Sequence, residues 1–139
     1  MSGQVKDIIR IENLCRDFVV GSETVHALRG VSFSIQPAQP GEFVTIMGTS
    51  GSGKSTLLNV LGCLDIPTSG EYYLDGMPVR EMGKNDRASY RNLKIGFIFQ
   101  SYNLLPKTTA LENVELPLLY NPSVSKRVRR EKALSALKA

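Results

Sequence analysis

Residues 48–55 read GTSGSGKS, which matches the pattern G-x-x-x-x-G-K-[ST] at every fixed position. The stretch before them, Phe43–Met47, is almost entirely apolar, as is typical of a short strand buried on both faces of a sheet. The leucine-rich residues 55–64 after them suit a buried helix. A strand, a glycine-rich loop and a helix in this order are the setting that the motif requires. The sequence therefore predicts a strand–loop–helix unit whose loop binds phosphate groups.

The residue types in this loop each suit a polyphosphate. Glycines let the backbone turn so that successive N–H groups point inward and surround an anion. The start of the following helix adds unpaired N–H groups and the positive end of the helix dipole. Lys54 supplies a full charge for the β- and γ-phosphates, and the Ser55 hydroxyl is an oxygen ligand of the kind that Mg²⁺ takes. The predicted phosphate-binding residues are Gly48, Thr49, Ser50, Gly51, Ser52, Gly53, Lys54, Ser55 and Thr56.

Hydrophobic patterning predicts the strands on either side of this unit. Residues 8–20 mix apolar and polar positions and are rich in β-branched side chains, which indicates a strand. Residues 31–35 alternate apolar and polar positions, which indicates a half-buried strand, and Gly21–Thr24 reads as a turn. Residues 72–74 and the apolar residues 95–99 predict two further short strands.

Capping signals predict the helices that follow. Thr109 and Glu112 form a capping box, so a helix should begin near Ala110, and Pro117 should kink or end it. Asp86 is the predicted cap of a helix over residues 86–93. A basic helix should occupy the last residues, beyond 122. This order predicts an α/β nucleotide-binding core, preceded by an antiparallel β subdomain and followed by a helical portion.

The composition is that of one ordinary globular domain. The 139 residues carry a net charge of +4, from 17 Lys and Arg against 13 Asp and Glu. Part of the excess lies in residues 126–132, KRVRREK, where a solvated helix face is the simplest interpretation because no aromatic side chains are present to stack on nucleic-acid bases. The two cysteines, Cys15 and Cys63, lack metal-site spacing and fit a reducing compartment. No apolar run reaches the 18 residues of a membrane-spanning helix.

The chain resembles the ATP-binding cassette family, from about residue 8 to its last residue, and is most similar to the branch serving lipoprotein release and macrolide export. The resemblance implies an antiparallel β subdomain at about residues 1–47, a P-loop NTPase core at about residues 48–100, and the start of a helical subdomain at about residues 101–139. The segments that carry it are MGTSGSGKSTLLN at 47–59, GCLD at 62–65, PTSG at 67–70, IGFIFQ at 95–100, NLLP at 103–106 and TALENVELP at 109–117.

The resemblance also assigns roles outside the loop. Gln100 matches the glutamine that contacts Mg²⁺ beside the γ-phosphate, and Ser55 matches the other Mg²⁺ ligand. Phe18 matches the aromatic residue that stacks on adenine. Taken alone, Gln100 would more often be a plain surface residue and Phe18 a core residue. Residues 101–116 match the surface that receives the membrane subunit, although core packing explains their leucines equally well.

The family's later motifs are missing from the sequence. No LSGGQ-type signature, no apolar strand ending in Asp-Glu and no switch histidine is present, and His26, which precedes the loop, is expected at a surface strand position. We therefore expect a fragment without catalytic residues that binds ATP and Mg²⁺ weakly and hydrolyses negligibly. A smaller departure is the apparent insertion at residues 36–41, which predicts a longer surface turn.

Three functions remain as alternatives. The first is the ATPase subunit of an exporter of hydrophobic or lipidated cargo, which would lie at the cytoplasmic face of a membrane, with a transmembrane permease and a second nucleotide-binding domain as partners. The second is a cassette ATPase that acts on DNA or the ribosome, which the modest net charge does not support. The third is a nucleotide-binding module that works by assembly alone.

Overall fold

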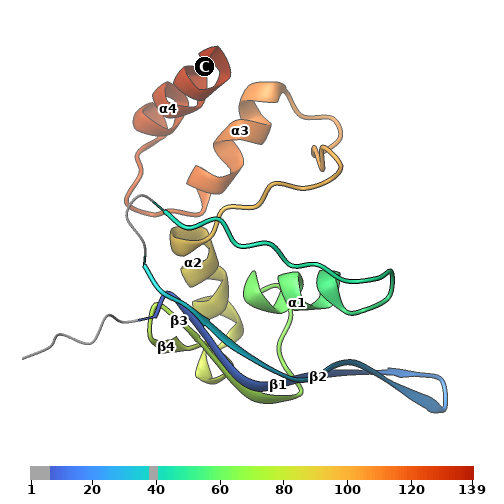
Figure 1. Ribbon diagram of the computed structural model, residues 1–139. Helices are drawn as coiled ribbons and strands as arrows, with labels where there is room; N and C mark the ends of the chain where they lie inside the picture. Colours follow the sequence, from blue (N-terminus) through green and yellow to red (C-terminus); the bar gives the residue numbers. More distant parts are fainter. Residues whose placement is uncertain (1–6, 38–40) are drawn as a thin grey trace, which may run out of the picture. The chain divides into compact units, whose positions relative to one another are not determined.

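The computed structural model describes residues 7–37 and 41–139, which divide into two compact units with the boundary between Arg87 and Ala88. Figure 1 traces the elements along the chain. The elements are β1 (Ile9–Val20), β2 (Glu23–Ile35), α1 (Lys54–Leu61), β3 (Ser69–Leu74), β4 (Met77–Pro78), the 3-10 helix η1 (Val79–Glu81), α2 (Lys84–Lys94), α3 (Ala110–Leu119) and α4 (Lys126–Lys138).

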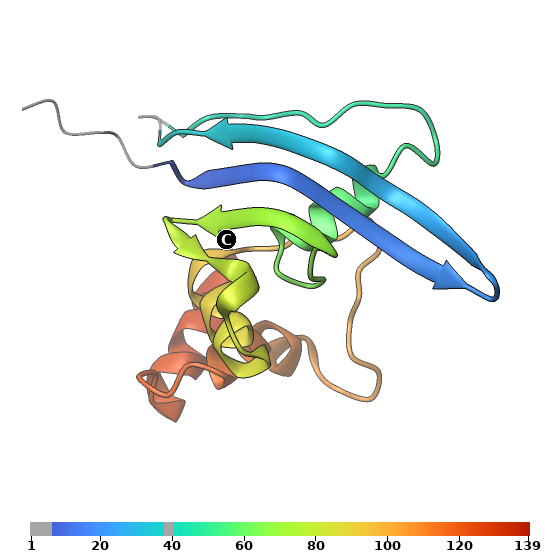
Figure 2. The ribbon, with the colours of Figure 1, turned by 90° about the horizontal axis from the view of Figure 1, so that it is seen from below.

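The first unit is built on an antiparallel sheet with the strand order β2-β1-β3-β4. Strand β3 pairs with β1 no further than Cys15, so the rest of β1 pairs with β2 alone. Figure 2 shows this two-stranded part running well past β3. The predicted strands at 8–20, 31–35 and 72–74 are confirmed, and the turn between the first two is the two residues Gly21 and Ser22.

Helix α1 covers one face of this sheet, as both views show (Figures 1 and 2). Its inward side chains, Leu57 and Val60, are buried. The hydroxyl of the buried Tyr72 on β3 donates a hydrogen bond of 2.7 Å to the Leu61 carbonyl, at the end of the helix. The core between helix and sheet is completed by Ile11, Leu14, Leu28, Cys63, Leu74 and Val79.

Two predicted strands are wrong. Residues 43–47 and 95–99 have no regular structure, and the sheet formed by residues 7–37 and 41–139 includes neither of them. A strand needs a neighbour to pair its backbone N–H and C=O groups, and neither stretch has one. Their apolar side chains are correspondingly exposed, Phe43 to 93%.

The remaining predictions fare better. The helix predicted at residues 86–93 exists but begins at Lys84, so Asp86 lies in its first turn and is not its cap. Helix α3 passes through Pro117 and ends at Leu119, and α4 confirms the predicted basic helix. His26 is exposed on β2, as predicted. The predicted insertion falls partly on residues 38–40, which lie outside the described residues.

In the second unit, α3 begins with the predicted capping box. The Thr109 hydroxyl accepts a hydrogen bond of 3.2 Å from the Glu112 N–H, and the Thr109 N–H donates one of 2.7 Å to the Glu112 carboxylate. The hydrogen bonds from the Thr109 N–H and then from its hydroxyl hold the pKa of Glu112 below its ordinary value of 4.5. Because the folded-state pKa is lowered, the stabilisation is present above the unfolded-state pKa and is lost as the pH falls through the folded-state pKa.

We predict that Thr109→Ala raises the pKa of Glu112 toward 4.5, because one of its two donors is lost. The titration of the Glu112 carboxyl carbon, followed by NMR, measures this shift. Thr108→Ala is the matched control, since the Thr108 hydroxyl donates to Leu105 and not to Glu112. An unchanged pKa in Thr109→Ala would contradict the capping role.

Candidate functional site

The loop at residues 48–53 turns tightly into the start of α1. The Ser52 N–H donates a hydrogen bond of 3.2 Å to the Thr49 carbonyl, and helix α1 begins at Lys54. The Leu57 N–H donates the first backbone hydrogen bond of this end of the helix, 2.8 Å to the Gly53 carbonyl. The N–H groups of residues 54–56 therefore precede the helical bonds, which makes this end of α1 a concentration of donors with positive potential.

Gly53 is the point where the loop meets the sheet. Its φ angle is 91°, in the left-handed region, and a Cβ atom there would lie 2.5 Å from the Ala27 carbonyl oxygen on β2. Ala27 is an extra residue in β2, because Arg16 faces Leu28 while Asp17 faces His26. Such a bulge bends a strand and redirects its backbone groups. Only glycine fits between the helix and this carbonyl.

The Lys54 side chain folds back over the loop. Its ammonium group donates hydrogen bonds to the Gly48 carbonyl at 2.8 Å and the Thr49 carbonyl at 2.6 Å, and contacts the Ser52 hydroxyl at 3.4 Å. The positive charge of Lys54 thus lies beside the turn at residues 48–52. All three partners are neutral, so no carboxylate among these contacts offsets the charge that an anion would meet.

Ser55 has the chemistry expected of a Mg²⁺ ligand. Its side chain is exposed in the first turn of α1, next to Lys54. Mg²⁺ is commonly held by one or two protein oxygens together with phosphate oxygens and water, so one hydroxyl at this place fits the ion. Within residues 7–37 and 41–139, no three His, Cys, Asp or Glu side chains are grouped to hold a metal ion.

Phe18 lies in the two-stranded part of the sheet, opposite Val25, and is 36% exposed. Val25 is two residues from Ala27, whose carbonyl meets Gly53, so Phe18 lies about 7 Å along the strand from the loop at ~3.3 Å per residue. The predicted aromatic residue and the predicted phosphate loop are thus both carried by the first unit.

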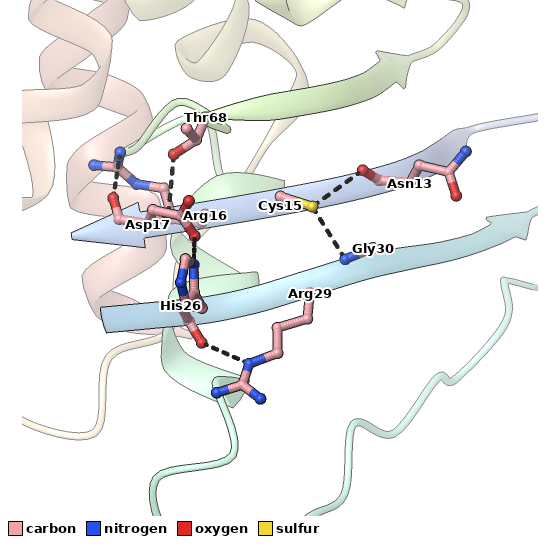
Figure 3. A network of polar contacts seen from close by, with 8 residues as sticks. All are labelled: Asn13, Cys15, Arg16, Asp17, His26, Arg29, Gly30 and Thr68. Carbon is pink, nitrogen blue, oxygen red and sulfur yellow. Dashed lines mark hydrogen bonds and ion pairs between the residues drawn. The ribbon is translucent and has the colours of Figure 1, made fainter. Parts of the chain in front are cut away.

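The segment between α1 and β3 is tied to β1 just before Phe18. The Thr68 N–H donates to the Cys15 carbonyl at 2.8 Å, and the Thr68 hydroxyl accepts from the Asp17 N–H at 2.9 Å. Figure 3 shows Thr68 beside β1, with the Asp17 carboxylate reaching His26 across the hairpin. These contacts fix the strand that carries Phe18 relative to helix α1.

Sequence reasoning missed Arg16 and Asp65, which form a two-pronged ion pair at this place. Arg16 Nε lies 2.7 Å from Asp65 Oδ2, and Nη2 lies 2.8 Å from Oδ1. The Arg16 guanidinium also lies over the Phe18 ring, 4.4 Å from its centroid. The two charged residues are 49 positions apart, so no local pattern could have indicated the pair.

Gln100 belongs to the second unit and is exposed. The loop and Phe18 belong to the first unit. The meeting of Gln100 with the phosphate loop therefore stays a prediction.

The sequence model of the ABC transporter family matches residues 28–139. The chain is 49% identical over 133 residues to the macrolide export ATP-binding/permease protein MacB of Brucella abortus, a match that covers 94% of this chain and 20% of that protein. It is 47% identical over 133 residues to MJ0796, an ABC transporter ATP-binding protein of Methanocaldococcus jannaschii, covering 94% of this chain and 55% of the relative. The chain thus spans about half or less of the length of these relatives.

The fold is similar to solved structures of the same M. jannaschii cassette. A dimeric structure of MJ0796 matches with a TM-score of 0.82 over 94% of this chain and 56% of that chain, at 47% identity. A post-hydrolysis structure of MJ0796 bound to ADP and inorganic phosphate matches with the same TM-score at 46% identity. The predicted fold class, a nucleotide-binding core with an antiparallel β subdomain and helices, is confirmed.

The contact between Gly53 and Ala27 yields a prediction about stability. Gly53→Ala should lower the free energy of unfolding by at least about 1 kcal/mol more than Gly51→Ala, because its Cβ also overpacks the Ala27 carbonyl. Gly51, with a φ angle of 79° and no atom near its Cβ position, isolates the left-handed backbone cost of about 1–2 kcal/mol. Urea unfolding of both variants measures the difference. Equal losses would show that the contact with β2 is not tight.

Proposed function

This chain belongs to the ABC transporter family, and we propose that residues 48–56 bind the phosphates of ATP. The observation that carries this proposal is the loop itself. It turns into the start of α1 with Lys54 held over it, and Gly53 is seated against the Ala27 carbonyl. The adenine would stack on Phe18, which lies on the same unit, and the Ser55 hydroxyl would be a ligand of Mg²⁺. A role of Gln100 at Mg²⁺ remains the prediction made from the family resemblance.

In the proposed binding event, the Lys54 ammonium would exchange backbone carbonyl acceptors for phosphate oxygens. The Lys54 ammonium now donates to the Gly48 and Thr49 carbonyls, which are neutral acceptors. Phosphate oxygens are anionic, and hydrogen bonds between ionised groups are roughly twice as strong as neutral ones. The N–H groups that open α1 would complete the shell around the phosphates. Bound Mg²⁺ would neutralise part of the phosphate charge.

Hydrolysis belongs to our proposal for the intact protein. Two findings support it. The chain belongs to the ABC transporter family, and it is similar to the cassette MJ0796, for which a post-hydrolysis state with ADP and phosphate is described. Phosphoryl transfer needs a residue that orients the attacking water in addition to the phosphate loop. We assign no such catalytic residue to this chain, and we therefore propose that it binds ATP with negligible hydrolysis.

The proposed partners are a transmembrane permease and a second nucleotide-binding domain. The similarity to an ATP-binding/permease protein supports the first, and the similarity to a dimeric cassette supports the second. None of the described helices is long and apolar enough to cross a membrane. We propose that the intact protein works at the cytoplasmic face of a membrane in the export of a hydrophobic or lipidated substrate, as the likeness to a macrolide exporter suggests.

Loss of the loop lysine should weaken nucleotide binding. We expect Lys54→Ala to bind ATP with Mg²⁺ at least about 10-fold more weakly, the loss expected for hydrogen bonds to a charged group. Isothermal titration calorimetry measures the affinity. Lys84→Ala is the matched control, because Lys84 is exposed on α2 in the same unit. If Lys54→Ala and the parent chain bound ATP equally well, the proposed function would be wrong.

A further inference from the structure

We propose that Arg16 is a positioning residue for the nucleotide base, because Asp65 holds its guanidinium over the Phe18 ring. The proposal rests on the proposed function and deepens it. It concerns the base of the nucleotide and not its phosphates. Neither Arg16 nor Asp65 touches the phosphate loop through any contact of the described residues, so their role would be exerted through Phe18.

The geometry of Arg16 is fixed from two sides. Two of its nitrogens contact the two oxygens of Asp65 at 2.7 and 2.8 Å, a parallel arrangement that sets the plane of the guanidinium. A third nitrogen, Nη1, donates to the Asp17 carbonyl at 3.3 Å. The side chains of Arg16 and Asp65 are only 24% and 26% exposed. Arginine suits this position because its planar group can pair with a carboxylate and stack on a ring at the same time.

The Arg16 guanidinium lies over the Phe18 ring, and Phe18 remains partly exposed. The guanidinium carbon is 4.4 Å from the ring centroid, within the range of a cation–π contact. An aromatic ring has two faces, and a single guanidinium lies over one of them, while the whole residue remains 36% exposed. A purine stacking on the other face would meet a ring that is held in place before it arrives. Preorganisation of this kind improves affinity because less conformational freedom is lost on binding.

The charges decide which part of the nucleotide would feel Arg16. Asp65 neutralises the guanidinium at hydrogen-bond distance, so the pair as a whole has no net charge. A neutral pair adds little attraction for a triphosphate, in contrast to the Lys54 ammonium, whose contacts are all neutral groups. The base and the phosphates should therefore respond to different residues.

A comparison of two probes tests this inference on the full chain. The probes are ATP and inorganic tripolyphosphate, each with Mg²⁺, titrated by calorimetry. We expect Arg16→Met to weaken ATP binding about 3- to 10-fold, the range of a partly buried cation–π contact, and to leave tripolyphosphate binding within about 2-fold. Asp65→Asn, which releases the guanidinium, should also lower the ratio of ATP affinity to tripolyphosphate affinity.

A matched control exists on the same strand. Arg10 lies over the ring of Tyr73 at 4.3 Å, so Arg10→Met removes a contact of the same kind far along β1 from Phe18. This variant should leave the ratio of the two affinities unchanged. Urea unfolding of each variant shows whether it is folded, and Asp65→Asn carries the test if Arg16→Met is not.

A combined variant separates positioning from a general structural role. If Arg16 acts through the ring, Arg16→Met should have no further effect on ATP affinity once Phe18→Leu has removed the ring. Full additivity of the two substitutions, or equal weakening of both probes by Arg16→Met, would overturn the inference. Failure of the proposed function looks different, since the parent chain would then bind neither probe, or Lys54→Ala would bind both as the parent chain does.

Discussion

The close approach of Gly53 to the Ala27 carbonyl is the contact on which the candidate site depends. It brings the first residue before α1 against β2, at the place where an extra residue interrupts the pairing of β1 with β2. Any side chain at Gly53 would push the helix away from the sheet. Because the donors at the start of α1 are useful only where the loop can present them, this backbone contact determines where an anion would be bound.

The other end of the helix is fixed just as firmly. The Tyr72 hydroxyl on β3 donates a hydrogen bond to the Leu61 carbonyl. The segment that follows the helix is tied to β1 through Thr68 and Asp65. A helix held at both ends against one sheet cannot shift its dipole relative to that sheet without breaking these contacts. The same ties reach β1 directly before Phe18. The phosphate loop and the aromatic residue thus belong to elements that are tied to the same sheet in the first unit.

The sequence predicted those features that depend on neighbouring residues. The long strands β1 and β2, the helix after the glycine-rich loop and the capping box of α3 each follow from patterns within a few positions. The wrong strands at residues 43–47 and 95–99 have a non-local cause. Apolar composition indicates that a segment suits burial, but a strand forms only beside a partner.

The candidate site divides in the same way. The loop residues could be predicted because their spacing is itself the motif, whereas the placement of Arg16 against Asp65 and Phe18 depends on how the segment after α1 returns to β1. Gln100 and Phe18 came from resemblance to the family, since neither residue type indicates a nucleotide by itself. Contacts between residues that are far apart in the chain cannot be predicted from the local pattern of a single sequence.

The two units differ in what stabilises them, and this difference bears on the site. Among the described residues, every buried apolar side chain except Ala133 belongs to the first unit. The second unit has capped helices α3 and α4, and an ion pair in which Arg129 Nε lies 4.0 Å from Glu115 Oε2, between side chains that are mostly buried. Breaking such a pair leaves a charge without its partner, and exposed caps contribute only modestly. The phosphate loop and Phe18 therefore lie in the unit with a hydrophobic core, whereas Gln100 lies in the unit that packs few apolar side chains.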